Sequence, residues 1–273
     1  MTDDDLRRYW NDYAHLFADE IAQNTVLLGR VLISHLRLDQ ARAILEVGAG
    51  PGNSARVVAE QMPSDARLVV TDLSPAMLEF ARDSLARVVQ SRSIAVEVET
   101  ANCEELPYPD GSFDRILGNL CLMLVDDPDR ALAEAHRVLE PGGIAAWSVW
   151  GRPEHSHMFT IPGRAAKIAG IALPEGRRSN FHLGDRDSLR QRIESHGFGP
   201  TIAWYQAMIP DVRDGARYAD LTLRTPRWRG ILAGQPEDQV AEFRRQLAIS
   251  ADELLARGQG IGLDALIVIA HKP

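Results

Sequence analysis

Cysteine is scarce in this chain. Among 273 residues only Cys103 and Cys121 occur, without the spacing of a metal-ligand pair and in too small a number for a disulfide framework. This usage is typical of proteins from a reducing compartment, so we expect a cytoplasmic protein with no metal site.

The chain also lacks an excess of positive charge and long apolar runs. The 30 basic and 38 acidic residues give a formal charge of −8, so no global positive field would attract phosphate backbones, and we expect no nucleic-acid partner. No apolar run reaches the roughly 18 to 20 residues of a membrane span. The chain begins Met1-Thr2-Asp3-Asp4-Asp5, which is acidic, whereas a secretory signal begins with basic residues.

A glycine-rich turn follows the apolar run at residues 43–47. The run reads Ala43-Ile44-Leu45-Glu46-Val47-Gly48-Ala49-Gly50-Pro51-Gly52-Asn53. A strand that feeds such a turn and then a helix brings free backbone N–H groups and a positive helix end together, which suits a nucleotide-like cofactor. The dinucleotide fingerprint Gly-x-Gly-x-x-Gly would need its third glycine at position 53, where Asn53 stands. This spacing opposes a nicotinamide cofactor.

Strand-like and helix-like segments alternate along the chain. Helices between the first strands are expected to begin near Asn53, Pro75 and Pro128, which gives right-handed βαβ units. We therefore predict an α/β fold with a doubly wound, Rossmann-like, mostly parallel sheet of about seven strands. The expected strands are Ala43–Val47, Leu68–Thr71, Ile94–Val98, Phe113–Gly118, Ile144–Val149, Thr201–Ile209 and Leu263–Ala270.

Helical patterns before and after these strands suggest additions to one domain that spans residues 1–273. Residues 1–40 are expected to form a helical cover, and residues 41–150 the cofactor-binding core. Residues 151–184 and 211–258 read as helical insertions. Because they follow late strands of the sheet, we expect them to cap a substrate site above its carboxyl edge.

Four motifs in the correct order resemble the class I S-adenosylmethionine-dependent methyltransferases, in particular those of ubiquinone and menaquinone biosynthesis. They are the glycine turn, Asp72 at the end of the second strand, Leu-Pro-x-Pro-Asp-Gly-Ser-Phe-Asp within 106–114, and Leu-x-Pro-Gly-Gly at 139–143. The resemblance covers residues 43–149 and fades toward the end of the chain. It implies S-adenosyl-L-methionine as cofactor and methyl transfer to an oxygen, carbon or nitrogen atom of a small metabolite.

The resemblance also implies roles for individual residues. The glycine turn would line the methionine end of the cofactor, the Asp72 carboxylate would accept from both ribose hydroxyls, and Asn102 would accept from the adenine amine, where the family usually carries aspartate. Independently of a ligand, Asp72 or Ser74 could cap the helix at Pro75. The implied cofactor-binding residues are Tyr13, Glu46, Gly48, Ala49, Gly50, Gly52, Asn53, Asp72, Leu73, Met77, Asn102, Cys103, Glu104, Asn119 and Leu120.

Catalysis of this kind needs little beyond in-line positioning of the methyl acceptor. If a proton must be removed, His155 and His157 are candidates, because imidazole titrates near neutral pH. Tyr9, Trp10 or Tyr13 could close over the cofactor, or could simply pack the first helix onto the sheet. Asp126 and Asp127 resemble a metal-binding pair, but capping of the helix at Pro128 explains them better.

The segment Asn119-Leu120-Cys121-Leu122-Met123-Leu124 bears on the substrate. It lacks the Asn/Asp-Pro-Pro-aromatic pattern of enzymes that methylate base amines, and its side chains would form an apolar wall. We expect a small apolar or aromatic metabolite as substrate. A nicotinamide-dependent oxidoreductase, a protein methyltransferase and a non-catalytic cofactor-binding relative remain alternatives. The oligomeric state stays open, and a homodimer is compatible with the sequence.

Overall fold

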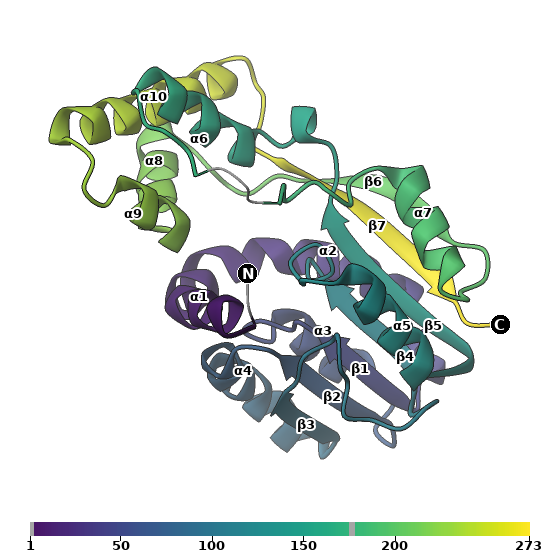
Figure 1. Cartoon of the computed structure of the whole chain (residues 1–273). Helices are drawn as coiled ribbons and strands as arrows, with labels where there is room; N and C mark the ends of the chain where they lie inside the picture. The colour runs from purple at the N-terminus through teal and green to yellow at the C-terminus, as the bar shows by residue number, and fades with distance from the viewer. Residues whose placement is uncertain (1–2, 175–177) are drawn as a thin grey trace.

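A seven-stranded sheet forms the centre of the computed structural model, which describes residues 3–174 and 178–273 (Figure 1). Its strand order is β3-β2-β1-β4-β5-β7-β6, and β7 alone runs antiparallel to its neighbours β5 and β6. The expected α/β, Rossmann-like fold is confirmed. The strands are β1 (Ala43–Val47), β2 (Arg67–Asp72), β3 (Ala95–Thr100), β4 (Phe113–Asn119), β5 (Leu139–Trp150), β6 (Ile202–Met208) and β7 (Leu263–His271).

Helices cover both faces of the sheet. The Ser148 hydroxyl of β5 donates to Asn119, whose amide donates to the Thr25 carbonyl of α2. Trp147, one residue earlier, lines a cavity with residues of α5. Since adjacent residues of a strand face opposite sides, α2 and α5 lie on opposite faces of the sheet. The helices of this sheet layer are α2 (Ala22–His35), α3 (Asn53–Gln61), α4 (Pro75–Arg92), α5 (Pro128–Val138) and α7 (Arg186–Ser195). Across the residues that the structure describes, no helix is both long and apolar enough to cross a membrane.

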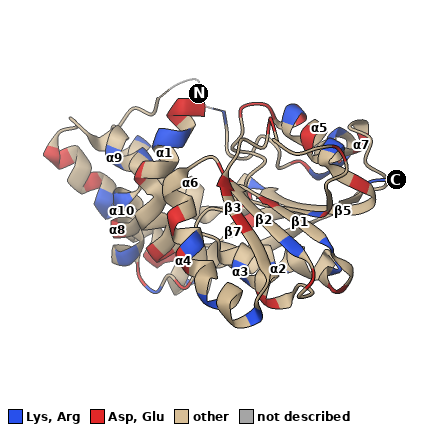
Figure 2. Ribbon diagram, turned by 90° about the horizontal axis from the view of Figure 1, so that it is seen from below, with Lys and Arg blue, Asp and Glu red and all other residues tan. Residues whose placement is uncertain are grey.

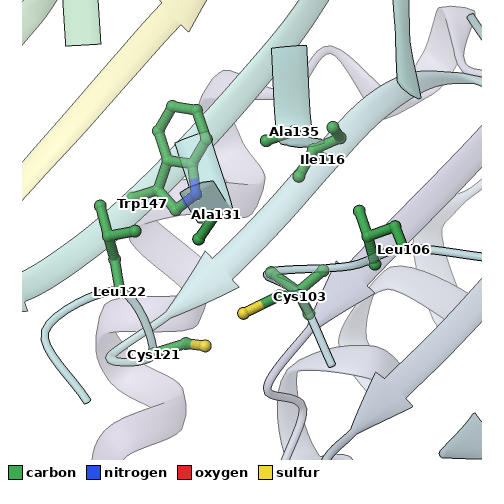
Figure 3. A pocket seen from close by; sticks show the side chains of 9 residues that line it. Cys103, Leu106, Ile116, Cys121, Leu122, Ala131, Ala135 and Trp147 are labelled. Carbon is green, nitrogen blue, oxygen red and sulfur yellow. The ribbon is translucent and has the colours of Figure 1, made fainter. Parts of the chain in front are cut away.

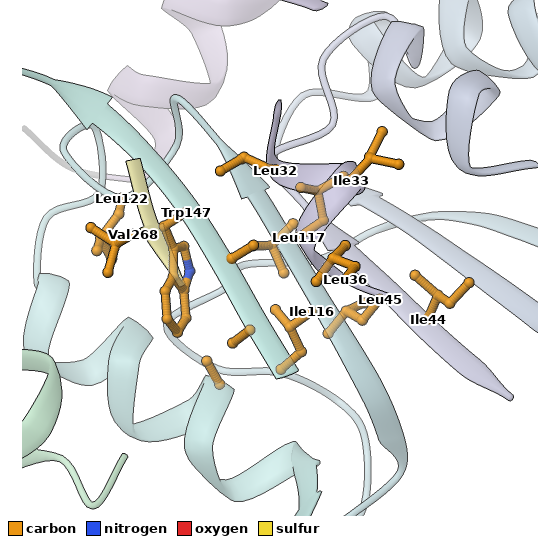
Figure 4. Packing of buried hydrophobic residues seen from close by; sticks show 14 of the residues in the cluster. Leu32, Ile33, Leu36, Ile44, Leu45, Ile116, Leu117, Leu122, Trp147 and Val268 are labelled. Carbon is orange, nitrogen blue, oxygen red and sulfur yellow. The ribbon is translucent and has the colours of Figure 1, made fainter. Parts of the chain in front are cut away.

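The main hydrophobic core lies between α2 and the sheet and continues beneath α5 (Figure 4). Leu32 and Leu36 of α2 are fully buried, as are Leu45 on β1 and Leu117 on β4. Burial of one such side chain stabilises the fold by about 1.5 to 3 kcal/mol. This core holds the carboxyl ends of β1, β2 and β4 in fixed positions, and the glycine-rich turn leaves the sheet from this edge.

The three expected helix starts at Asn53, Pro75 and Pro128 are confirmed, and side-chain caps explain the last two. The Ser74 hydroxyl accepts from the Met77 N–H at 3.2 Å at the start of α4. At the start of α5, Asp127 Oδ1 accepts from the N–H groups of Asp129 at 3.0 Å and Arg130 at 3.2 Å. Capping is thus the role that the geometry gives to Asp127. Within the described ranges, no group of three or more His, Cys, Asp or Glu side chains could hold a metal ion.

β1 has the predicted bounds, four strands differ from the prediction by one residue at one or both ends, and β3 and β5 differ by more. β3 ends at Thr100 instead of Val98, because Thr100 still pairs with Asp72 although its side chain breaks the apolar pattern. β5 begins at Leu139 instead of Ile144, because Leu139 pairs with Phe113 across a bulge in the register. Neither pairing could be recognised from local residue patterns.

The two insertions pack together into one helical cap with its own hydrophobic core. α6 (His157–Ile168) follows β5, whereas α8 (Gly215–Arg224), α9 (Pro226–Leu232) and α10 (Glu237–Ala256) lie between β6 and β7. Tyr218, Phe243 and Leu247 are almost fully buried in this second core. Figure 1 shows the cap above the carboxyl edge of the sheet.

The cap also meets the first helix through ion pairs. Arg229 of α9 lies 3.1 Å from the Asp12 carboxylate of α1 (Asp3–Leu16), and Arg224 of α8 lies 2.9 Å from Glu20. Glu20 belongs to a π-helical turn, η1 (Phe17–Ile21), that links α1 to α2. Basic and acidic residues alternate where α1 and α9 lie side by side (Figure 2). The N-terminal cover is therefore held between the sheet layer and the cap.

Candidate functional site

The glycine turn after β1 has a backbone that other residues could not adopt without strain. Gly48 and Gly52 have φ values of +63° and +79°. A Cβ atom at Gly52 would lie 2.9 Å from the Ala81 Cα of α4, and one at Gly48 would lie 2.4 Å from Cys121 Sγ. The turn thus brings its bare backbone, and the N-terminus of α3 at Asn53, to the edge of the sheet.

Asp72 ties this turn to the end of β2. Its Oδ2 accepts from the Gly50 N–H at 2.8 Å, and its Oδ1 accepts from the Ser74 N–H at 2.8 Å. Burial raises the pKa of Asp72, and the N–H bonds from Ser74 and Gly50 oppose that rise. The carboxylate retains further lone pairs for a ligand at this edge.

Glu46 at the end of β1 has a buried carboxyl group, one oxygen of which is unpaired in the part of the chain that the structure describes. Its side chain is 1% exposed, and its Oε2 has no hydrogen-bond partner among the described residues. Burial, together with the charge of Asp72, raises the pKa of Glu46 well above its usual range. A buried acceptor without a donor is costly, and a cationic donor at the turn would satisfy it.

The segment after β3 forms the next part of the rim. Asn102 Oδ1 accepts from the Glu104 N–H at 2.9 Å. The Glu104 carboxylate accepts from the N–H groups of Asp126 at 2.8 Å and Asp127 at 3.2 Å. These bonds fasten the rim to the loop before α5, so the Glu104 side chain serves the fold, and a cofactor role for it stays a prediction.

Cys103 and Cys121 lie across from each other beneath this rim, and Figure 3 shows their sulfur atoms directed toward one another. They border an apolar cavity of about 10 Å³, which is about the volume that one water molecule needs and far too small for a nucleoside. A hydrogen bond between the two thiols and burial raise the pKa of Cys121 well above its usual range. The cavity is lined by Val47, Cys103, Leu106, Ile116, Cys121, Leu122, Ala131, Ala135 and Trp147.

Asn119 and Leu120 make the turn that follows β4. The Asn119 amide donates to the Thr25 carbonyl at 3.1 Å and accepts from the Ser148 hydroxyl at 2.7 Å. Leu120 has a φ of +55°, which is uncommon for a residue with a side chain and marks a strained turn at this edge. Because the Asn119 side chain is engaged in the fold, its predicted contact with a cofactor would involve the backbone.

The first helix reaches over the same edge. Its Asn11 Oδ1 accepts from the Ser74 hydroxyl at 2.6 Å, and its Arg7 Nε donates to the Leu73 carbonyl at 3.3 Å. Tyr13 stacks on Trp10 with ring centroids 5.7 Å apart and meets Phe17 edge-on at 5.6 Å. Met77, the other residue predicted beside adenine, is 1% exposed in the first turn of α4.

Sequence reasoning missed Phe17. Its ring lies 3.8 Å from the position of a Cβ atom on Gly50, so it is placed at the glycine turn itself. The spacing of Trp10, Tyr13 and Phe17 at three and four residues could have revealed a shared aromatic face. The π-helical turn that orients Phe17 has no comparable signal in the sequence.

The two histidines predicted as bases lie at the joint between β5 and the cap. His155 is exposed and ends a short 3-10 turn, η3 (Pro153–His155), whereas the partly buried His157 begins α6. Asp264 fixes this joint, because its Oδ2 accepts from the Arg152 backbone N–H at 3.0 Å and from the Arg152 Nε at 2.9 Å. A role for either histidine in proton transfer stays a prediction.

Comparison with known proteins identifies the family. A family model described as a methyltransferase domain matches residues 45–147. The chain is 32% identical over 194 residues to a ubiquinone/menaquinone biosynthesis C-methyltransferase of Marinomonas sp., an alignment that covers 71% of this chain and 74% of that protein. The chain belongs to the class I S-adenosylmethionine-dependent methyltransferases. S-adenosylmethionine is accordingly its cofactor.

Two further comparisons differ in how much of the chain they cover. A malonyl-[acyl-carrier protein] O-methyltransferase of Geobacter sulfurreducens is 35% identical over 156 residues, which are 57% of this chain and 55% of that protein. The chain spans about half the length of that protein and of two ubiquinone/menaquinone biosynthesis C-methyltransferases that it also matches. A solved phosphoethanolamine N-methyltransferase of Haemonchus contortus has the same fold, with a TM-score of 0.56, 17% identity, and coverage of 100% of this chain and 57% of that chain.

Proposed function

We propose that this chain binds S-adenosylmethionine at the glycine turn and transfers its methyl group to an oxygen, carbon or nitrogen atom of a small apolar or aromatic metabolite. The buried, unpartnered Oε2 of Glu46 carries the proposal. An oxygen of this kind next to bare backbone N–H groups suits a ligand end with both an ammonium and a carboxylate, as the methionine part of the cofactor has.

The remaining cofactor residues follow the rim of the site. Asp72 would accept from the two ribose hydroxyls, and Leu73 and Met77 would pack on the adenine. Cys103 and the Leu120 backbone would lie beside the same nucleoside. Tyr13 of α1 would close over the cofactor as part of the aromatic cluster that includes Phe17.

When bound, the cofactor supplies a methyl group on a positively charged sulfur, which is already activated for transfer. The chain's own residues would position the methyl acceptor in line and keep water away. The aromatic cluster of α1 and the helical cap flank the edge where this exclusion is needed. His157 would take a proton from the acceptor where the reaction releases one.

An aromatic cluster at the end of β5 supports the proposed substrate class. Trp150 meets Phe159 edge-on at 5.2 Å between ring centroids, and Phe159 meets Phe181 at 6.1 Å. Trp150 is buried, but Phe159 is 37% exposed on the first turns of α6. Apolar side chains with an exposed aromatic face favour an apolar or aromatic metabolite over a highly charged one.

Calorimetric titration with S-adenosylhomocysteine, beside NADH, tests the cofactor part of the proposal. Binding of the adenosyl compound alone is expected, and binding of NADH alone would overturn it. Incubation of the protein with methyl-labelled S-adenosylmethionine and a cell extract tests the substrate part. Label is expected in the small-molecule fraction. Label in protein would indicate a protein methyltransferase, and the absence of turnover would indicate a non-catalytic relative.

Glu46→Gln is expected to stabilise the ligand-free protein by about 1 to 3 kcal/mol at pH 8. Because the folded state raises the pKa of Glu46, the wild type loses stability as pH rises above the unfolded value of about 4.3. The difference between variant and wild type should therefore shrink toward pH 4. Urea unfolding at pH 4, 6 and 8 measures it.

Glu104→Gln is the matched control for that experiment, because its carboxylate has two N–H partners. It should lose stability at pH 8, since an amide offers only one acceptor oxygen. An equal effect of Glu46→Gln at all three pH values would contradict the assignment of a buried, unpaired carboxylate.

His157→Ala is expected to lower kcat by about 100-fold if the substrate must lose a proton, because a positioned base contributes about that much. The affinity for S-adenosylhomocysteine should not change. His196→Ala is the control, since His196 Nδ1 bonds to the Arg192 carbonyl at the end of α7. Wild-type turnover of the His157 variant would remove this residue as a base, and the same assay on His155→Ala would then test the other candidate.

A further inference from the structure

One face of α1 carries three polar side chains that bond to the rim of the cofactor site. Asp3, Arg7 and Asn11 are four residues apart, so they lie in a row along the helix. Arg7 and Asn11 bond to the turn at residues 73–74, as described above. Asp3 extends this row to the segment after β3, where its Oδ2 accepts from Asn102 Nδ2 at 2.9 Å.

The contact between Asp3 and Asn102 arranges a donor and an acceptor side by side. The oxygen of the Asn102 amide already accepts from the Glu104 N–H, so the nitrogen is the part that is turned toward Asp3. That nitrogen carries two hydrogens, of which one is used by Asp3. The other hydrogen and the Asp3 carboxylate together present one donor and one acceptor.

Adenine has the complementary pattern on its N1/N6 edge, with an acceptor at ring N1 and a donor at the exocyclic amine. Hypoxanthine reverses both, since its N1 carries a hydrogen and its O6 accepts. Against the Asn102 and Asp3 pair, hypoxanthine would bring donor against donor and acceptor against carboxylate. Unpaired polar groups of this kind discriminate more strongly than a merely missing contact.

We propose that Asp3 is a specificity-determining residue that accepts a hydrogen bond from the adenine amine, with Asn102 donating to ring N1. This inference rests on the proposed function, and it adds a residue that the sequence analysis did not consider. The first turn of α1 would thus select the adenosyl group, in addition to covering the site. Where the family usually carries aspartate, this chain has Asn102. The Asp3 carboxylate, about 100 residues away in the sequence, would take the place of that aspartate.

Titration of S-adenosylhomocysteine and S-inosylhomocysteine into three proteins tests this inference. The wild type is expected to prefer the adenosyl compound by about 100-fold, and Asp3→Ala should reduce that preference to about 10-fold or less. Asp5→Ala is the matched control. It removes the same charge from the same helical turn, where Asp5 pairs with Arg8 at 2.5 Å, and it should keep the wild-type preference.

A second variant distinguishes the loss of adenine recognition from a structural effect of Asp3→Ala. Asn102→Asp in the Asp3→Ala background places a carboxylate directly at the rim and should restore the preference for the adenosyl compound. An unchanged preference in Asp3→Ala, or an equal loss of affinity for both ligands, would overturn the inference. If the wild type bound neither ligand, the proposed function itself would fail, which the first titration shows before any variant is made.

Discussion

Replacing Gly52 with alanine is expected to lower the free energy of unfolding by about 3 kcal/mol. The positive φ at this position costs a residue with a side chain about 1 to 2 kcal/mol. The added Cβ would also lie 2.9 Å from the Ala81 Cα, and backbone cannot turn away as a flexible side chain could. Because α3 and α4 would have to separate, binding of S-adenosylhomocysteine should be lost as well. Urea unfolding and calorimetry measure the two effects.

Alanine variants at two other glycines distinguish backbone strain from close packing as the cause of the lost stability. Gly234 also has a positive φ, of +82°, but a Cβ there would meet nothing within 4 Å, so Gly234→Ala should cost only the conformational strain. Gly163 lies inside α6 with open space around it, and Gly163→Ala should stabilise the protein by about 0.5 to 1 kcal/mol. If Gly52→Ala were no worse than Gly234→Ala, the close packing of α3 on α4 would not matter.

Asp72→Ala is expected to weaken binding of S-adenosylhomocysteine by about 1 to 3 kcal/mol, a factor of about 5 to 150. Under the proposed function, the variant removes the acceptor of two charge-assisted hydrogen bonds from the ribose. It also leaves the Gly50 and Ser74 N–H groups without their partner, so the glycine turn would lose its tie to β2. Calorimetric titration gives the affinity, and urea unfolding reports any loss of stability separately.

Asp114→Ala provides the control for Asp72→Ala. Asp114 is buried as well and also accepts from two backbone N–H groups, those of Arg42 at 2.7 Å and Ala43 at 3.3 Å. It lies at the amino ends of β1 and β4, away from the glycine turn. The control should therefore lose stability and keep the wild-type affinity. Wild-type affinity in Asp72→Ala would remove this carboxylate from the cofactor site.

Local patterns were sufficient to predict much of the sheet layer. Asp127 and Pro128 determine where α5 begins through interactions within one helical turn, and Ser74 with Pro75 does the same for α4. The glycine motif required a strand, a turn and a helix in that order, and the structure has them. Features that depend on neighbours in sequence could thus be read from the sequence.

Features that depend on distant residues could not be predicted in this way. The sequence suggested two separate insertions, but Phe243 of α10 shares a buried core with Ile161 of α6, about 80 residues away. The bond between Asp3 and Asn102 and the placement of Phe17 on Gly50 likewise join segments that no periodicity connects. Because packing between elements decides such contacts, the helical cover and the cap are where sequence reasoning was weakest.

The position of β7 has a consequence for how the protein is made. In the described sheet, β6 pairs with β7 only, and β7 in turn lies between β6 and β5. During synthesis on the ribosome, β6 emerges more than 50 residues before its partner strand, so its backbone groups must wait for hydrogen bonds that only residues 263–271 can supply. Until then one edge of β5 and both edges of β6 are unpaired in the nascent chain, and such edges make it vulnerable to aggregation at that stage.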